Sequence, residues 1–346
     1  MHMADALLSP GVGGAMWAAT AATTVYCARK VHEEADDRKV PLMGVLGAFV
    51  FAAQMINFTI PGTGSSGHLG GGLLLALLLG PHAAFLTIAS VLVVQALFFA
   101  DGGLLALGAN IFNMGVFSCF VAYPLVFRPL AGKDPSPGRL TWASVAAAVV
   151  GLQLGALGVV LETVFSGISD LPFSKFVLLM LPIHLAIGVG EGFVTAAVVN
   201  FARKAEPGLL GGHIPSASGG YRKLLAGLAV AALVVGGALS WFASAHPDGL
   251  EWSIAGITGS EELEAPADGI HGTLARIQEK LSFLPDYGFK DVGGSDKTAA
   301  SEKETWPAVD PGTSVSGIVG GLITLAVAAA IGLLLRRRSR AQARVA

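Results

Sequence analysis

The sequence predicts an all-α fold, a polytopic helical membrane protein of about nine spans. Hydrophobic residues make up 53% of the 346 residues and charged residues only 13%, whereas soluble domains carry about 25% charged residues. The mean hydropathy is +0.65. Glycine accounts for 46 residues, which fits close packing of helices in lipid. We therefore expect the lipid bilayer, and no nucleic acid, as the surroundings of this chain.

Apolar stretches follow one another along the chain, and a transmembrane helix needs about 20 such residues. The stretch at 69–80 is short, and Pro81 separates it from the next one. These two stretches can be counted as a hairpin of two spans or as one kinked span. The candidate spans lie at about 11–28, 41–60, 69–80, 82–99, 107–127, 141–165, 176–201, 223–243 and 314–335.

The positions of Lys and Arg decide between the two counts, because cytoplasmic loops collect basic residues. With nine spans and the N-terminus outside, 16 of the 22 Lys and Arg residues fall on the cytoplasmic side. Counting 69–99 as one span would move Arg128, Lys133 and Arg139 to the outside. We therefore expect nine spans in the cell inner (plasma) membrane, with the N-terminus outside and the C-terminus cytoplasmic.

Proline and glycine interrupt the apolar pattern near 205–222 and predict a boundary between two units. The first unit, 1–219, holds seven of the spans. The second, 220–346, holds two spans that bracket an acidic external segment at 244–313. Gly70, Gly71 and Gly72 lie inside a hydrophobic run and lack the GxGxxG or Walker spacing. Nothing in either unit resembles a Walker motif, so we expect no ATP hydrolysis by this chain.

The first two residues, Met1 and His2, form a candidate metal chelate. No Lys or Arg precedes Arg29, so the start lacks the basic region of a secretory signal. The bulky His2 should also block removal of Met1. The α-amine, the amide nitrogen and the imidazole could then hold one ion in fused rings, an in-plane arrangement that suits Ni(II) or Cu(II). The alternative is a Met-His start that simply lies in water.

His68 is the histidine that the topology places beside this chelate. The loop 61–68 is external in the nine-span count, as is the N-terminus, so His68 can complete the coordination plane. His32, His82 and His213 fall on the cytoplasmic side. The remaining candidates, His246 and His271, lie in the acidic segment without a partner at metal-binding spacing.

Several polar residues lie in or beside the spans, where they are costly and usually face the protein interior. Metal-bound imidazoles normally donate their second N–H to a carboxylate, carbonyl or amide. Gln95, Asp101 and Asn110 are therefore candidate partners of the ligands, with bonding between helices as the alternative. For Glu191 the alternatives are a proton or ion relay and a hydrogen bond between helices.

Motifs in the first 200 residues resemble the CbiM/NikM substrate-binding membrane component of cobalt and nickel energy-coupling-factor (ECF) transporters. The segment PDGLE at 247–251 is similar to the hallmark of the small CbiN/NikN accessory component, so the two components look fused. The motifs of the larger component are GTGSSGHLGG at 62–71, LLGP at 78–81, QALFFADGG at 95–103, LGANIFNMG at 107–115 and GVGEG at 188–192.

The resemblance implies a metal site built from the N-terminal amine, the amide and imidazole of residue 2 and the His of the SGH loop. These match Met1, His2 and His68. It implies a transport component, not an enzyme, that captures Ni(II) or Co(II) as its substrate and has no cofactor. Its partners would be a transmembrane coupling subunit and cytoplasmic ATPase subunits.

Two other functions compete with this one. An ion-gradient-driven secondary transporter tends to show internal repeats, and none is convincing here. An intramembrane metalloenzyme would need HExxH or clustered ligands with an open position, and the histidines here are scattered. We expect the second unit to help load or hold the chelate without supplying a metal ligand.

Overall fold

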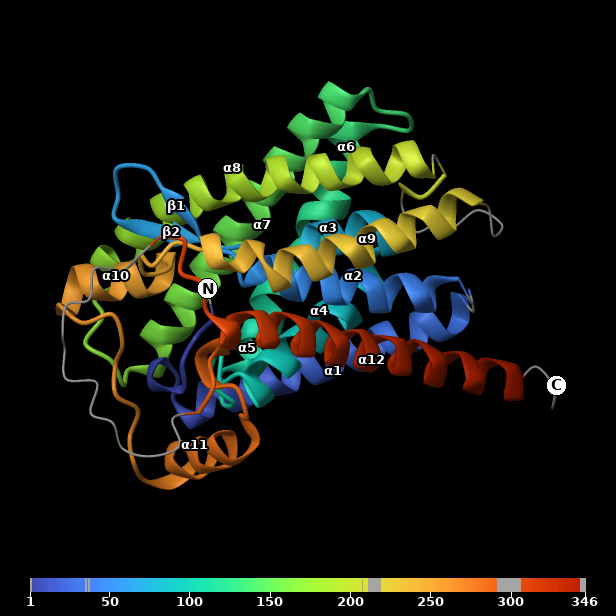
Figure 1. The fold of residues 1–346 in the computed structure, drawn as a ribbon. Coiled ribbons are helices and arrows are strands. Elements are labelled where there is room, and N and C mark those ends of the chain that lie inside the picture. Colours follow the sequence, from blue (N-terminus) through green and yellow to red (C-terminus); the bar gives the residue numbers. More distant parts are fainter. Residues whose placement is uncertain are drawn as a thin grey trace.

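Long helices that run roughly side by side form the body of the molecule (Figure 1). The structure, a computed structural model, describes residues 2–34, 36, 38–206, 208–210, 219–290 and 306–342. The strands in these ranges are β1 (Phe58–Ile60) and β2 (Ser65–Gly67), which pair antiparallel with Phe58 opposite Gly67. The prediction of a helical fold is confirmed.

The first unit contains the helices that surround the β1–β2 hairpin. Proline stands in the first turn of α4 and α7, where its missing N–H costs nothing. The Oγ of Ser136 caps α7 by accepting a hydrogen bond from the N–H of Arg139. The helices are α1 (Pro10–Glu34), α2 (Lys39–Gln54), α3 (Gly72–Leu79), α4 (Pro81–Phe98), α5 (Leu107–Ile111), a π-helical stretch (Phe112–Phe127), α6 (Arg128–Ala131), α7 (Pro137–Ser166) and α8 (Phe173–Ala205).

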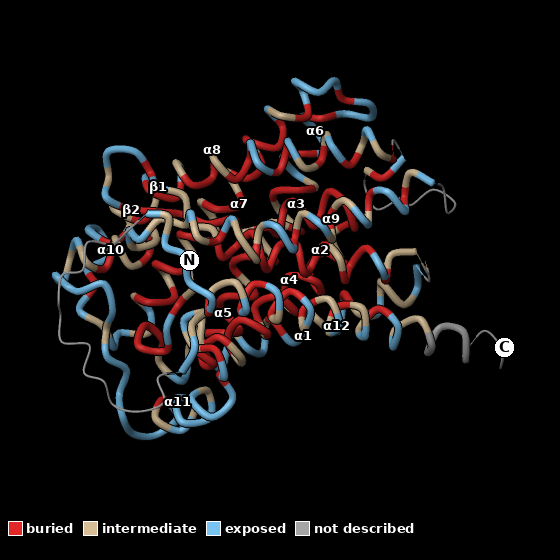
Figure 2. The backbone as a smooth tube through the Cα atoms, in the orientation of Figure 1, coloured by how far each residue is buried: buried red, intermediate tan, exposed pale blue. Residues whose placement is uncertain are grey.

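Helix α3 is the predicted short span, and it is shorter than expected. Its eight residues, all buried, cover about 12 Å at 1.5 Å per residue, and β2 and a segment without regular secondary structure precede them. Directly after α3, the Nδ1 of His82 lies 3.6 Å from Oε1 of Glu34, the last residue of α1. The chain has therefore reached the end of the bundle where α1 leads into α2. Figure 2 shows α2, α3 and α4 as the buried centre.

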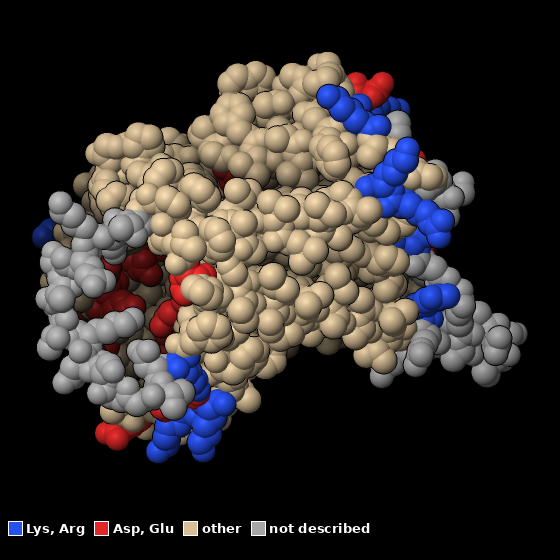
Figure 3. All heavy atoms as spheres, viewed as in Figure 1, with Lys and Arg blue, Asp and Glu red and all other residues tan. Residues whose placement is uncertain are grey.

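Six helices in the described ranges are long and apolar enough to cross a membrane. Helix α2 is apolar but has only 16 residues, because the predicted 41–60 stretch ends as strand β1. Figure 3 shows a broad face without charged side chains over the middle of the bundle, as an integral membrane protein requires. The six helices are Pro81–Phe98, Leu107–Ala131, Pro137–Ser166, Phe173–Ala205, Gly219–Gly237 and Pro311–Arg336.

The second unit joins the same bundle. Helix α12 packs against α2, α4 and α9. A Cβ on Gly317 would lie 2.2 Å from the carbonyl oxygen of Gly236, so α9 and α12 cross as closely as glycine allows. Much of the predicted boundary, 211–218, lies outside the described residues. The elements of this unit are α9 (Gly219–Gly237), a 3-10 turn (Leu239–Phe242), α10 (Gly249–Thr258), α11 (Gly269–Leu281), a second 3-10 turn (Pro285–Tyr287) and α12 (Pro311–Gln342).

The two ends of the bundle differ. The β1–β2 hairpin, α10 and α11 gather at one end (Figure 1). At the other end, the Nδ1 of His32 and the carbonyl oxygen of Leu335 are 2.8 Å apart, which places the C-terminal part of α12 beside the end of α1. Most of the Lys and Arg side chains in Figure 3 gather at this second end, with another group over α11.

Candidate metal centre

The loop that carries His68 is held from two helices. The carboxylate of Glu191, on α8, accepts hydrogen bonds from the N–H groups of Gly70 at 2.8 Å and Gly71 at 3.2 Å. From α2, the side-chain amide of Gln54 donates to the carbonyl oxygen of Gly70 at 2.9 Å. These bonds hold the main chain of Gly70 and Gly71, just after His68. They therefore fix the position of the His68 imidazole.

A second clamp holds the start of the chain. The N–H of Met3 donates to Oδ1 of Asn110 at 2.8 Å, and the Nδ2 of Asn110 donates to the Met3 carbonyl oxygen at 3.2 Å. The N–H of Gly103 donates to the same carbonyl at 2.9 Å. Met3 is completely buried. His2 is thereby fixed in place, while Met1 lies outside the described residues.

The imidazoles of His2 and His68 lie against each other, as the sequence predicts. Their ring centroids are 5.1 Å apart and the planes differ by 11°. The Nδ1 of His2 lies 3.2 Å from Oδ1 of Asp101. Its Nε2 is buried and has no hydrogen-bond partner among the described residues. A buried polar atom left in this way is unusual.

Burial lowers the pKa of His2 to about 4, although the carboxylate of Asp101 raises it in part. The ring of His2 is therefore neutral at pH 7. At His68, Nδ1 lies 3.0 Å from the carbonyl oxygen of Leu69. A carbonyl can only accept, so Nδ1 of His68 carries the proton and, in the neutral ring, Nε2 carries the lone pair. Neutral imidazole is the form that binds a metal.

The three predicted partners of the ligands lie at different places. Asp101 contacts His2, as described, and its Oδ2 accepts a hydrogen bond from the hydroxyl of Tyr287. Asn110 contacts the main chain of Met3 instead of an imidazole. Gln95 donates to Oε1 of Gln54, the residue that holds the His68 loop. Asp101 thus faces a candidate ligand, while the other two support the segments that carry the candidate ligands.

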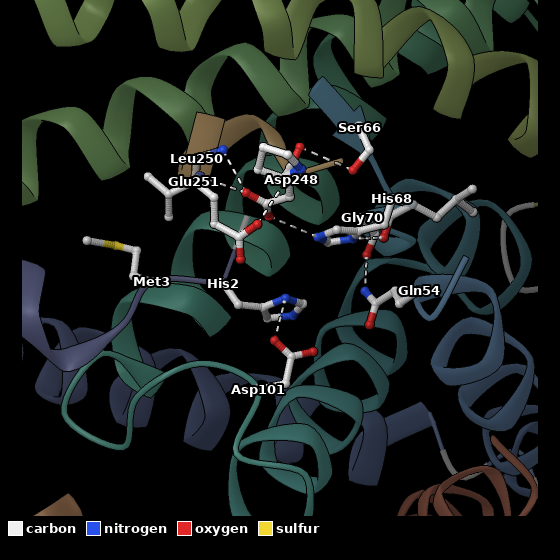
Figure 4. A network of polar contacts seen from close by, with 12 residues as sticks. His2, Met3, Gln54, Ser66, His68, Gly70, Asp101, Asp248, Leu250 and Glu251 are labelled. Atoms are coloured by element: carbon white, nitrogen blue, oxygen red, sulfur yellow. Dashed lines mark hydrogen bonds and ion pairs between the residues drawn. The ribbon is translucent and has the colours of Figure 1, made fainter. Parts of the chain in front are cut away.

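The second unit reaches this centre through Asp248, which the sequence analysis did not single out. Its Oδ2 lies 3.7 Å from the Nε2 of His68 (Figure 4). Its Oδ1 accepts hydrogen bonds from the N–H groups of Leu250 at 2.7 Å and Glu251 at 3.0 Å, which cap α10. The Glu251 carboxylate in turn accepts from the Asp248 N–H at 2.8 Å, completing a capping box.

Main-chain contacts seat the 247–251 turn on the His68 loop. The N–H of Ser66 donates to the carbonyl of Pro247 at 2.8 Å, and its hydroxyl donates to the carbonyl of His246 at 2.7 Å. A Cβ on Gly249 would lie 3.0 Å from Cε1 of His184 and from Cδ1 of Ile187. Only glycine lets α10 approach α8 this closely. A small cavity beside the turn is lined by Gly67, His68, Gly70, Met114, Leu152, His184, Ile187, Asp248 and Gly249.

Of the other histidines, His184 lines the same small cavity as His68, with its Nδ1 2.8 Å from the carbonyl oxygen of Met180, and the rest lie apart from the two stacked rings. The Nε2 of His271, on α11, lies 2.8 Å from the carbonyl oxygen of Leu8 and ties α11 to the N-terminal segment. The side chain of His246 is exposed. His32 and His82 lie at the far end of the bundle, and His213 is outside the described residues. Within the described ranges, no three His, Cys, Asp or Glu side chains converge on one point.

The sequence matches two family models. Residues 2–209 match the cobalt uptake substrate-specific transmembrane region, and residues 222–337 match the PDGLE domain. A putative fused nickel transport protein, NikMN, of Archaeoglobus fulgidus is 33% identical, over 98% of this chain and 99% of that protein. The fused nickel transport protein NikMN of Rhodobacter capsulatus is 33% identical, over 83% and 88% of the two chains.

Relatives without the second unit match the first part of the chain. The cobalt transport protein CbiM of Sorangium cellulosum is 32% identical, over 61% of this chain and 94% of that protein. The crystal structure of a transition metal transporter superposes with a TM-score of 0.52 at 31% identity, covering 60% of this chain and 94% of that one. At this identity the likeness extends to sequence as well as fold.

Proposed function

The chain belongs to the family of cobalt uptake substrate-specific transmembrane regions, fused to a PDGLE domain, and from that premise we propose that it captures Ni(II) or Co(II) for uptake. The observation that carries the proposal is the stacked pair of largely buried imidazoles, those of His2 and His68. Since fused relatives are named nickel transport proteins, we propose nickel first.

The ligands we propose are the α-amine of Met1, the amide nitrogen and imidazole of His2, and the imidazole of His68. The two imidazoles alone do not fill a coordination plane, and main-chain nitrogens supply the remaining donors in this proposal. Nδ1 is the ring nitrogen that can close a chelate ring with the residue's own amide. Metal loading therefore exchanges the contact of His2 Nδ1 with Asp101 for a bond to the ion.

We propose that the metal centre faces the outside of the inner (plasma) membrane. The Lys and Arg side chains at the opposite end of the bundle favour that end as cytoplasmic (Figure 3). The segment 68–81 runs between the ends as a short stretch without regular secondary structure followed by α3, which supports nine crossings with α3 as an incomplete helix. An external N-terminus and a cytoplasmic C-terminus follow from this count.

Energy for uptake comes, in this proposal, from the ATPase subunits and transmembrane coupling subunit of an ECF-type transporter. The alternative is a secondary transporter driven by an ion gradient. Metal uptake by cells that carry the chain separates the two: loss of uptake without the ATPase partners supports the first. Uptake that persists without those partners, and that collapses when the ion gradient is dissipated, supports the alternative.

The chelate is tested by nickel binding to the purified chain with its native N-terminus, measured by calorimetry. His2→Ala and His68→Ala should each remove a donor and weaken binding at least a hundredfold. Several residues fused before Met1 should abolish binding, because a peptide bond removes the amine. His246→Ala, which changes an exposed histidine near the same turn, is the matched control. Wild-type affinity in the extended chain would refute the role of the amine.

A further inference from the structure

The 247–251 turn delivers a fixed carboxylate to the candidate metal centre. The capping box orients Asp248, and the bonds from Ser66 hold the turn against the His68 loop. On the next turn of α10, the indole N–H of Trp252 donates to the carbonyl oxygen of Thr63 at 3.0 Å. Contacts with strand β2 and with the turn before it therefore fix the position of the Asp248 carboxylate.

The distance between Asp248 and His68 suits a shared cation. In the neutral ring, Nε2 of His68 carries a lone pair, because Nδ1 donates to the carbonyl of Leu69. Nε2 of His68 and Oδ2 of Asp248 lie 3.7 Å apart; they form an ion pair when the ring is protonated and are two facing electron donors when it is neutral. Metal bonds to imidazole nitrogen and carboxylate oxygen are about 2.0–2.2 Å long. One ion can therefore bind both atoms in a bent arrangement.

Charge supports the same arrangement. A chelate with one deprotonated amide leaves a divalent ion with a net charge of about +1. The side chains around the ion are mostly buried, with exposed fractions of 9% for His2, 8% for His68 and 13% for Asp248. An uncompensated charge in such surroundings is costly. Asp101 stands beside one imidazole and Asp248 beside the other, so a carboxylate faces each side of the centre.

We propose that Asp248 is an anionic oxygen ligand of the metal ion, so that the C-terminal unit supplies a donor which the four nitrogens lack. The inference rests on the proposed function. It replaces the expectation that the second unit supplies no ligand. A fifth donor has a consequence for nickel, since four planar nitrogens give spin-paired Ni(II), whereas an added oxygen donor favours a paramagnetic ion.

The test uses the full chain with its native N-terminus, loaded with Ni(II) in detergent. Asp248→Ser and Asp248→Asn remove the carboxylate while keeping a side chain that caps α10 well. Asp268→Asn is the matched control: Asp268 is exposed and precedes α11 without a side-chain capping bond. Calorimetry gives the dissociation constant, and paramagnetically shifted proton resonances report the spin state of the bound ion.

The wild-type chain and Asp268→Asn should hold paramagnetic Ni(II). The two Asp248 variants should bind at least tenfold more weakly and hold spin-paired Ni(II). Unchanged affinity and an unchanged spin state in both variants would overturn the proposal. So would weaker binding with paramagnetic nickel, because that result assigns Asp248 a structural role. Wild-type protein that binds nickel equally well with its N-terminus extended refutes the proposed chelate instead.

Discussion

Glu191 offers a quantitative test of how the His68 loop is held. Its carboxylate accepts hydrogen bonds from two buried N–H groups, those of Gly70 and Gly71. In Glu191→Gln, one carboxylate oxygen becomes an amide that cannot accept, so one N–H loses its partner. A buried donor without a partner costs about 1–3 kcal/mol. If this free energy destabilises the loop conformation that binds nickel, the nickel affinity drops about 5-fold to 150-fold.

The matched control is Glu162→Gln, which makes the same change at a buried carboxylate in α7 that contacts Asn113 and not the loop. Calorimetry on both variants in detergent measures the difference. Wild-type nickel affinity in Glu191→Gln would refute the reasoning from the loop. If that variant bound nickel normally but failed in cellular uptake, the alternative of a proton or ion relay would gain instead.

Two further predictions concern the surroundings of His2. Tyr287→Phe removes the hydroxyl that donates to Asp101 and should weaken nickel binding about threefold to tenfold. The control is Tyr221→Phe, which removes a hydroxyl that donates to the Arg38 carbonyl at the far end of the bundle and should leave nickel affinity unchanged. Equal nickel affinities of the two variants would count against an effect through Asp101. The second is a pH dependence: because the pKa of His2 is about 4 in the fold and about 6.5 when unfolded, the unfolded chain binds more protons between these values. Thermal stability of the metal-free protein should therefore fall as pH decreases from about 6.5 to 4, and less steeply in His2→Gln; parallel curves would contradict the assignment.

The sequence predicted the helical fold. It also predicted that His2 and His68 lie close together, because the hydropathy and charge patterns predict both on one side of the bilayer. The same reasoning overestimated the third span. A run of apolar residues around Gly70–Gly72 is typical of helix, but α3 begins only at Gly72, after the left-handed Gly71, and the N–H groups of Gly70 and Gly71 donate to Glu191. Hydropathy carries no information about such a side-chain clamp.

Asp248 and Tyr287 could not be placed from the sequence. Each lies more than 170 residues from the group it contacts. The spacing of Asp248 and Glu251 does predict a capping box, so the start of α10 was readable. The sequence did not show which part of the molecule this turn contacts. That depends on the pairing of Asp248 with Ser66 and on the space that Gly249 leaves beside α8.

The peptide link between the two units and their meeting point at the metal centre lie at opposite ends of the bundle. Helix α8 ends at Ala205 and α9 begins at Gly219, where the hydroxyl of Tyr221 bonds to Arg38 beside the start of α2. Helix packing and the seated turn, not the tether, therefore hold the units in register. Two separately translated chains could assemble in the same way, and fusion then secures a one-to-one ratio and a high effective concentration.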